Sequence, residues 1–366
     1  MRWTTGVVFA VSVLMSQVCA WGGQEPVKRT RAEMEALIQK EGTTPPEWWD
    51  SVELRYPPML DLNWPIKVDG PWDANVNVGQ YLWDVINPNP DRWKEGIKLV
   101  NFLMNRHKDD RAKLARSTET LGRMYHDLME DYARAVFWWR ISAKYGGSVD
   151  SISLAHCYWK LGCREMAEET LSQVRSDRTR HGALIKLRAD MGDFDKALQL
   201  AEQKAKAGSP TIAYLAAGHA CRLAGRHQEA LAYYRKALAG KDAKGREGDN
   251  KKGKERAQAS IEAITLFDTL DVARVPDGTY TAESLAYAGP LCVEVAVEEG
   301  RILSVRVTKH EEKQFYGAMA DTPAQIVARQ GVKGVDAVTG ATMTSEAILN
   351  ATAKALAGGM QKADGR

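Results

Sequence analysis

One short run near the C-terminus of this chain combines hydroxyls with a turn, Asp336-Ala337-Val338-Thr339-Gly340-Ala341-Thr342-Met343-Thr344-Ser345. The apolar residues of 345–356 recur at helical spacing, so the run is expected to be a loop that leads into a helix. Thr344 or Ser345 is expected to cap the helix, and both can hydrogen-bond a phosphate there. A helix N-terminus presents unpaired N–H groups and a positive dipole end, which suit a phosphate. Gly340 and Ala341 allow close backbone approach. The run therefore predicts a phosphate-binding loop with the Thr342 hydroxyl beside it.

The run resembles the flavinylation motif of the FMN-binding domain family, Asp-x-x-(Ser/Thr)-Gly-Ala-Thr. Its fixed positions are filled by Asp336, Thr339, Gly340, Ala341 and Thr342. In that family, a dedicated flavin transferase moves FMN from FAD onto the last threonine as a phosphoester. The resemblance implies a covalent FMN on Thr342, with Asp336 helping the transferase to recognise its target. The alternative is a glycine turn before a capped helix, in which Asp336 caps the loop.

The residues before this run follow the same family's order of elements. Alternating apolar residues predict strands over 279–287, 291–297 and 303–307, with a turn at Glu299-Gly300, and Pro323 lies near the start of a helix over 321–329. This order resembles a small α+β FMN-binding domain over about 276–357. In the family, the segment after the hairpin lies near the flavin ring. Ring contacts are therefore expected from Glu312, Phe315 and Tyr316, with ordinary core burial as the alternative.

The middle of the chain carries an internal repeat with a period of about 30 residues. The aligned positions are Ala135, Ala167, Ala197 and Ala230. Three glycines placed for turns precede them, Gly162, Gly192 and Gly225. The pattern resembles tetratricopeptide and Sel1-like repeats. The expected fold is an all-α helical-repeat solenoid followed by the small α+β domain, with the repeats binding a protein partner.

The composition divides the chain into seven expected parts. These are a signal peptide at 1–20, a Trp/Pro-rich extended segment at 21–80 that packs against the following helices, α-helical repeats at 81–238, a charged Gly-rich linker at 239–258, a closing helix at 259–275, the FMN-binding domain at 276–357 and a disordered tail at 358–366. A docking surface for a partner or redox centre is the alternative for the tryptophans.

The N-terminus has the form of a secretory signal. Arg2 precedes a short apolar run, and Val18-Cys19-Ala20 offers a cleavage point near Ala20. Export to the periplasm or another extracytoplasmic compartment is expected, with an uncleaved anchor as the alternative. The remaining cysteines show no haem or cluster spacing, and they are either buried thiols or include a Cys157–Cys163 disulfide. No metal site is expected.

Charge and motifs together leave three functions open. The net charge is +3 from 50 basic and 47 acidic residues, which gives no reason to expect a nucleic-acid partner. The first function is an exported electron carrier with unknown redox donor and acceptor proteins. The resemblance extends to the flavin subunits of Na+-pumping NADH:quinone reductase and Rnf-type complexes, so a membrane redox complex is one possible partner. The second is a repeat-based adaptor with a structural or unflavinylated C-terminal domain, and the third is an FMN-dependent reductase component.

Overall fold

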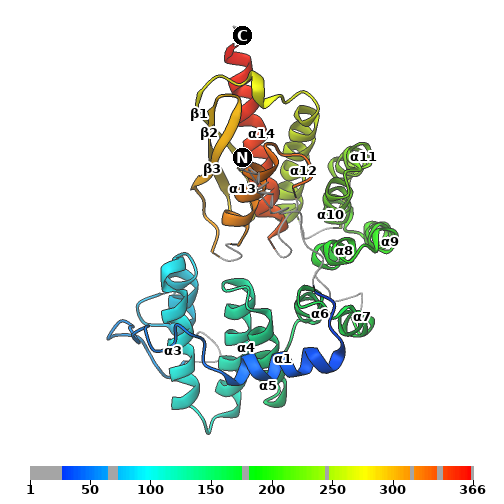
Figure 1. Cartoon of the computed structure of the whole chain (residues 1–366). Coiled ribbons are helices and arrows are strands. Elements are labelled where there is room, and N and C mark those ends of the chain that lie inside the picture. The colour runs from blue at the N-terminus through cyan, green and yellow to red at the C-terminus, as the bar shows by residue number, and fades with distance from the viewer. Residues whose placement is uncertain are drawn as a thin grey trace, which may run out of the picture.

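The computed structural model describes residues 27–64, 73–174, 181–243, 247–313, 317–335 and 341–363. Helices α3 to α11 form the repeat region, and a three-stranded sheet with two helices forms the C-terminal domain (Figure 1). The expected fold class, helical repeats followed by a small α+β domain, is confirmed. The expected signal segment lies outside the described residues.

The N-terminal segment wraps around the first helices of the repeat region. It contains α1 (Arg31–Thr43), α2 (Val78–Tyr81) and a π-helical turn (Leu82–Ile86). Thr30 caps α1 through a capping box with Glu33, which is why the helix begins there. Trp64 is buried, and Trp48 and Trp49 pack against the same core, so the expected wrap is confirmed for these tryptophans.

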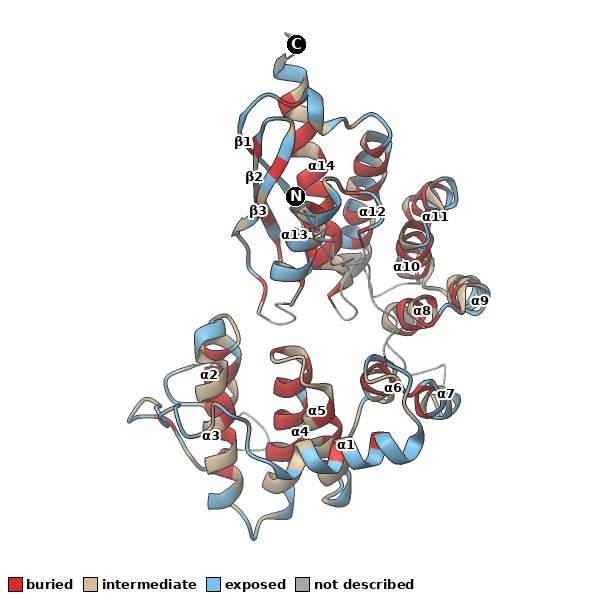
Figure 2. Cartoon of the chain, viewed as in Figure 1, coloured by how far each residue is buried: buried red, intermediate tan, exposed pale blue. Residues whose placement is uncertain are grey.

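The repeat region is a series of helical hairpins. Its helices are α3 (Trp93–Arg106), α4 (Arg111–Asp127), α5 (Tyr132–Lys144), α6 (Ser151–Lys160), α7 (Arg164–Ser172), α8 (His181–Asp190), α9 (Phe194–Lys206), α10 (Pro210–Leu223) and α11 (His227–Ala239). The aligned alanines lie in the second helix of successive hairpins, and each is fully buried, because paired helices approach too closely there for a larger side chain (Figure 2). Gly162, Gly192 and Gly225 adopt φ of +90°, +80° and +70° in the turns between paired helices.

The charged segment expected to be a linker at 239–258 is helical from Glu247 onward. Helix α12 spans Glu247–Phe267, and Ala257, Ala263, Ile264 and Phe267 are buried along one of its faces. Gly253 permits this, because a Cβ there would lie 2.9 Å from Cγ2 of Thr211 on α10. The prediction of an unstructured linker was wrong, since tertiary burial outweighs the glycine content and charge. The expected closing helix over 259–275 also ends early, at Phe267, and a 3-10 turn follows at Val272–Arg274.

The C-terminal domain is built on an antiparallel sheet in the order β1 (Gly278–Leu285), β2 (Pro290–Glu298) and β3 (Arg301–Lys309). Val293, Val295 and Val297 of β2 are buried, as the alternation predicts. In β3, Ile302 pairs with Val297 and Ser304 with Ala296, so Leu303 is an extra residue at a bulge and is 54% exposed. The simple alternation expected for Leu303, Val305 and Val307 is therefore broken.

Two helices cover the sheet. Helix α13 (Gly317–Arg329) packs on β3 and begins four residues before the expected start, and α14 (Thr342–Ala363) packs on β1 and β2. The prediction of a disordered tail at 358–366 was wrong for residues 358–363. Helix α14 continues to Ala363, and Met360 packs against the core.

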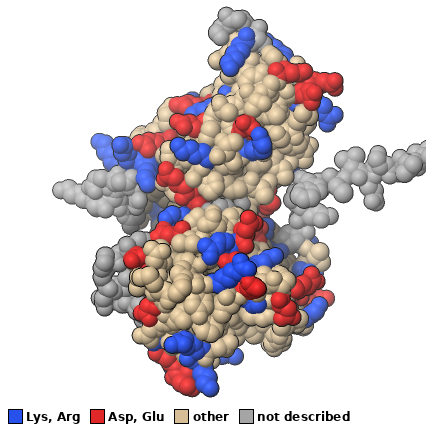
Figure 3. Space-filling view, turned by 90° about the vertical axis from the view of Figure 1, so that its left-hand side faces the viewer, with Lys and Arg blue, Asp and Glu red and all other residues tan. Residues whose placement is uncertain are grey.

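The repeats form an arc, and the C-terminal domain folds back toward the N-terminal helices (Figure 1). Helix α12 joins the two parts, since it contacts α10 and α11 on one side and α14 and β1 on the other. On the face drawn in Figure 3, acidic and basic side chains of the described residues intermingle and form no large patch of one charge. No described helix is long and apolar enough to cross a membrane.

Candidate functional site

Thr342 is the first residue of α14, three residues before the expected helical start at Ser345. The N–H of Ser345 donates to the carbonyl of Ala341 at 3.0 Å, which closes the first turn of the helix. The N–H groups of residues 342–344 precede that bond and have no acceptor within the helix. Thr342 itself is half-buried, whereas Ala341 behind it is buried. The described part of the run is thus a helix N-terminus that begins with a half-buried threonine. Asp336, Thr339 and Gly340 lie outside the described residues.

Glu312 holds the first turn of α14 against the sheet. Its Oε2 accepts the hydroxyl of Thr344 at 3.1 Å, and its Oε1 accepts the backbone N–H of Ala288 at 2.9 Å. Glu312 and Thr344 are 3% and 2% exposed. These bonds join the end of β3, the β1–β2 turn and the start of α14. The structure therefore places Glu312 and Thr344 in a buried support beneath Thr342; a contact to a flavin ring or phosphate stays a prediction.

A second buried contact fixes the same turn from the repeat side. Arg222 on α10 donates from Nε to Oε1 of Glu346 at 2.9 Å and from Nη2 to the same oxygen. Both side chains are almost wholly buried. Ser345 is fully buried beside them. Since residues 344, 345 and 346 are all buried, the start of α14 is held rigidly on both sides.

The segment after β3 reaches the N-terminal helices. Lys313 Nζ forms an ion pair with Asp84 Oδ1 at 2.5 Å, and Asp84 lies in the π-helical turn. Phe315 and Tyr316, the other expected ring contacts, lie outside the described residues. Lys313 shows that this segment faces the N-terminal helices.

The first turn of α13 rests on the turn between α4 and α5. A Cβ added to Gly317 would lie only 1.7 Å from Oε1 of Glu130, so the glycine is needed for this approach. Glu130 itself adopts φ +52°. Burial raises the pKa of Glu130, and the charge of Asp321 on α13 raises it further. Burial likewise raises the pKa of Asp321. The charge of Asp321 thus acts on the Glu130 carboxyl between the repeat region and the C-terminal domain.

A histidine pair lies behind this contact. His126 Nε2 and His156 Nδ1 are 3.0 Å apart, and His126 Nδ1 bonds Asp127. Burial, together with the charge of His126, lowers the pKa of His156. The pair is buried among Tyr132 and Trp139. Cys157 next to it is a buried free thiol, as is Cys163, so no disulfide joins them.

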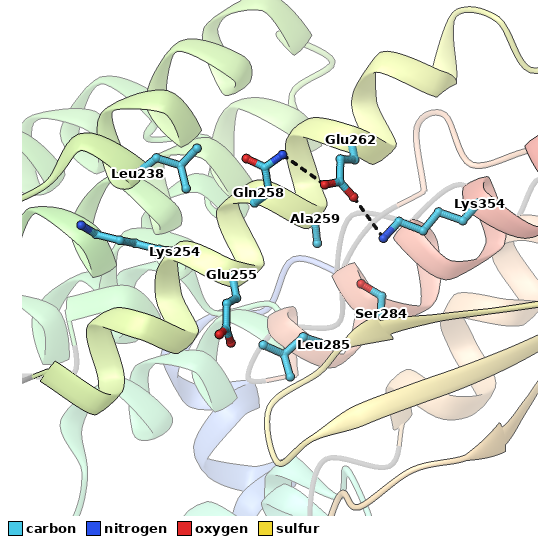
Figure 4. A pocket seen from close by; sticks show the side chains of 9 residues that line it. All are labelled: Leu238, Lys254, Glu255, Gln258, Ala259, Glu262, Ser284, Leu285 and Lys354. Carbon is cyan, nitrogen blue, oxygen red and sulfur yellow. Dashed lines mark hydrogen bonds and ion pairs between the residues drawn. The ribbon is translucent and has the colours of Figure 1, made fainter.

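A shallow groove lies elsewhere, where α12 meets β1 and α14 (Figure 4). Its volume is about 500 Å³, and its wall includes Glu262, which accepts from Gln258 at 3.1 Å and pairs with Lys354 at 3.2 Å. Lys354 lies about 18 Å along α14 from Thr342. The groove is therefore separate from the candidate site. Among the described residues, no group of three His, Cys, Asp or Glu side chains is arranged to hold a metal ion.

Sequence reasoning missed the residues that support the site from outside the motif. Arg222 lies on α10, Glu130 in the turn between α4 and α5, and Asp84 in the π-helical turn. The repeat pattern does not distinguish any of them. The one available signal was the arginine at 222 on a helix of small residues, because a buried face rarely carries an unpaired charge. Nothing in the sequence indicated that Glu346 is the partner of Arg222.

Comparison with known proteins agrees with both halves of this architecture. Residues 286–357 match the FMN-binding domain family, and residues 213–247 match a tetratricopeptide repeat. A protein of Treponema pallidum (strain Nichols), described only as "Uncharacterized protein", is 38% identical over 86 residues, which cover 23% of this chain and 24% of that protein. The chain thus spans about a quarter of that relative's length. No solved structure matches the chain significantly. The chain carries an FMN-binding domain preceded by tetratricopeptide repeats.

Proposed function

We propose that this chain is an exported electron-transfer flavoprotein that carries one FMN as a phosphoester of Thr342. The observation that supports this most is the position of Thr342, a half-buried residue at the N-terminus of a helix in which residues 344–346 are buried and hydrogen-bonded. The helix lies in the domain that matches the FMN-binding family.

The described residues fit an FMN phosphate. The N–H groups of residues 342–344 are free of helical acceptors and the helix dipole favours an anion at this end. Attachment joins the Thr342 oxygen to the FMN phosphorus of FAD and breaks the pyrophosphate bond, so AMP leaves and the hydroxyl proton is released. A flavin transferase catalyses that exchange, so this chain needs no base of its own. When bound, the flavin accepts and passes on electrons.

Export would explain why the flavin is attached covalently. Residues 1–20 have the composition of a cleaved secretory signal. Outside the cytoplasm, a dissociated flavin is diluted and not replaced. A phosphoester to Thr342 keeps the cofactor on the protein regardless of its concentration.

The helical repeats dock the flavin domain to a redox partner. Their inner side already receives α13 and the segment ending at Lys313, which leaves the outer faces of the hairpins for a second protein. The donor and acceptor proteins are unknown, and a membrane redox complex is one candidate. The adaptor function remains the alternative, and it requires no flavin on Thr342.

The test is a redox measurement on the protein co-expressed with a flavin transferase. The purified wild type is reduced chemically under nitrogen and then mixed with an artificial electron acceptor while flavin absorbance is followed. In a carrier, the flavin absorbance is bleached by reduction and recovers once when the acceptor is added. The Thr342→Ala variant should show no flavin absorbance after desalting under denaturing conditions. Catalytic turnover of a small substrate without a partner would instead favour the reductase, and absence of any bound flavin in the wild type would favour the adaptor.

A further inference from the structure

A small hollow in the N-terminal helices lies apart from Thr342. It is enclosed by α2, the π-helical turn, α4 and Trp64, and its volume is about 100 Å³. Trp83 in its wall adjoins Asp84, the residue that pairs with Lys313.

Two arginines of α4, Arg116 and Arg123, line the hollow. Neither guanidinium forms an ion pair or hydrogen bond with any residue in the described ranges. The guanidinium of Arg116 lies over the ring of Trp64, 5.9 Å from its centroid. Burial lowers the pKa of Arg116, and the positive charge of Arg123 lowers it further, so the two charges repel each other. Arg116 is half-buried and Arg123 is exposed, and the charge of Glu119 offsets part of the repulsion at Arg116. An anion placed between the two guanidinium groups would give both of them a direct partner.

Trp64 contributes a third unused donor. It is 2% exposed, and its indole N–H has no acceptor among the described residues. Its backbone adopts φ +45°, which is rare for a large side chain. A buried N–H without an acceptor is destabilising, so an acceptor in the hollow would stabilise it.

Gly79 leaves the space between these donors open. The point where a Cβ would lie is 3.6 Å from Nη2 of Arg116 and 4.0 Å from Nε1 of Trp64. The guanidinium and the indole N–H thus converge on one point that a glycine keeps free. The side-chain Oδ1 of Asn77 lies 3.3 Å from the same point and accepts the N–H of Gln80. Thr120 adds a hydroxyl to the same wall.

We propose that this hollow is a binding site for a small oxyanion, a carboxylate or phosphate, held by Arg116, Arg123 and the indole N–H of Trp64. A volume of about 100 Å³ corresponds to a few water molecules, which favours such an anion over a ring system. Asp127 also lines the hollow, but its carboxylate is engaged by His126. The site does not depend on a flavin at Thr342.

The test is calorimetric titration of the full-length protein with inorganic phosphate and, separately, with succinate, at an ionic strength held constant with chloride. Saturable one-site binding of either anion is expected, and the anion that binds identifies the class. Arg116→Gln should weaken that binding at least about tenfold. Arg235→Gln removes an exposed arginine on α11 and should leave it unchanged.

Gly79→Ala provides a variant that keeps every charge. Its methyl group meets no atom closer than 3.3 Å, so the fold should persist, yet it fills the point where the donors converge. It should weaken binding, whereas Gly182→Ala, at a helical glycine with no neighbour within 4 Å, should not. If neither anion binds above the chloride reference, or if both Arg116→Gln and Gly79→Ala bind as the wild type does, the proposal is wrong. If circular dichroism shows that Arg116→Gln is not folded, Arg123→Gln takes its place in this comparison.

Discussion

At the scale of single residues, the support under Thr342 depends on Glu312. One buried carboxylate accepts a backbone N–H from the β1–β2 turn and a hydroxyl from α14. Each of its oxygens thus satisfies a donor from a different element. The side chain that sequence reasoning placed beside a flavin ring therefore also fixes the helix that bears the proposed attachment residue.

Glu312→Ala should lower the free energy of unfolding by about 1–3 kcal/mol, because it leaves the buried hydroxyl of Thr344 and the N–H of the exposed Ala288 without their acceptor. The neighbouring Glu311→Ala is the control: Glu311 is exposed, and its loss should cost no more than about 0.5 kcal/mol. Urea unfolding measures both. Equal stability of the two variants would show that Glu312 does not hold the turn.

Residue types predicted the motif but not its surroundings. Thr342 and the helix after it follow from local turn and capping signals. The partner of Thr344 does not, because Glu312 lies 32 residues away and reaches it only after the sheet has formed. Thr344 was expected to cap the helix or bind a phosphate. It lies inside the first turn of α14 and not at its cap, its hydroxyl donates to Glu312, and a contact to a phosphate stays a prediction.

At the scale of elements, α10 and α14 are joined by the buried pair Arg222 and Glu346. Arg222→Ala should destabilise the protein by about 3–5 kcal/mol, because it leaves a buried carboxylate without its cation. Lys236→Ala, which breaks an exposed pair with Glu202, should cost less than about 1 kcal/mol.

The double variant Arg222→Met with Glu346→Leu separates charge from shape. It should recover most of the stability lost in Arg222→Ala, since no unpaired charge stays buried. Urea unfolding of the single and double variants gives the coupling between the two side chains. A double variant as unstable as Arg222→Ala would mean that the loss comes from altered side-chain volume and not from an unpaired charge.

The elements themselves were largely predictable. The aligned alanines and the positive-φ glycines indicate the helical repeat, and the alternation of buried and partly exposed residues in β2 indicates the sheet. Helix α12 was not predictable, because Gly253 and the surrounding lysines resemble a solvated tether until α10 packs against them. The bulge at Leu303 likewise depends on the register of two strands and not on one of them.

At the scale of the whole molecule, the C-terminal domain folds back onto the N-terminal helices (Figure 1). The contact includes Lys313 with Asp84, 229 residues apart in sequence, and Gly317 with Glu130. No local periodicity encodes such a contact, so it could not be expected from the sequence. It places the end of the domain that bears Thr342 toward the inner side of the repeats.

This contact should respond to pH. The pKa values of Glu130 and Asp321 are raised above their ordinary values of 4.5 and 3.8. Their contribution to stability is therefore fully present below these values and is lost as the pH rises through the raised pKa values. Glu130→Gln should be less sensitive to pH than the wild type and more stable than it near neutrality.

Unfolding free energies of the wild type and Glu130→Gln between about pH 4 and about pH 8 test this. Glu298→Gln removes an exposed carboxylate and should follow the wild-type curve. Parallel curves for Glu130→Gln and the wild type would show that Glu130 does not titrate against the C-terminal domain.

The central claim is tested most directly by the mass of the protein after co-expression with a flavin transferase. Intact mass and peptide mapping should show one FMN, less one water, on the peptide that contains Thr342. The adduct should persist in Thr342→Ser, which keeps the hydroxyl, and in Thr344→Ser, and it should vanish in Thr342→Ala. An unmodified wild type under these conditions, or an adduct that survives Thr342→Ala, would contradict the account.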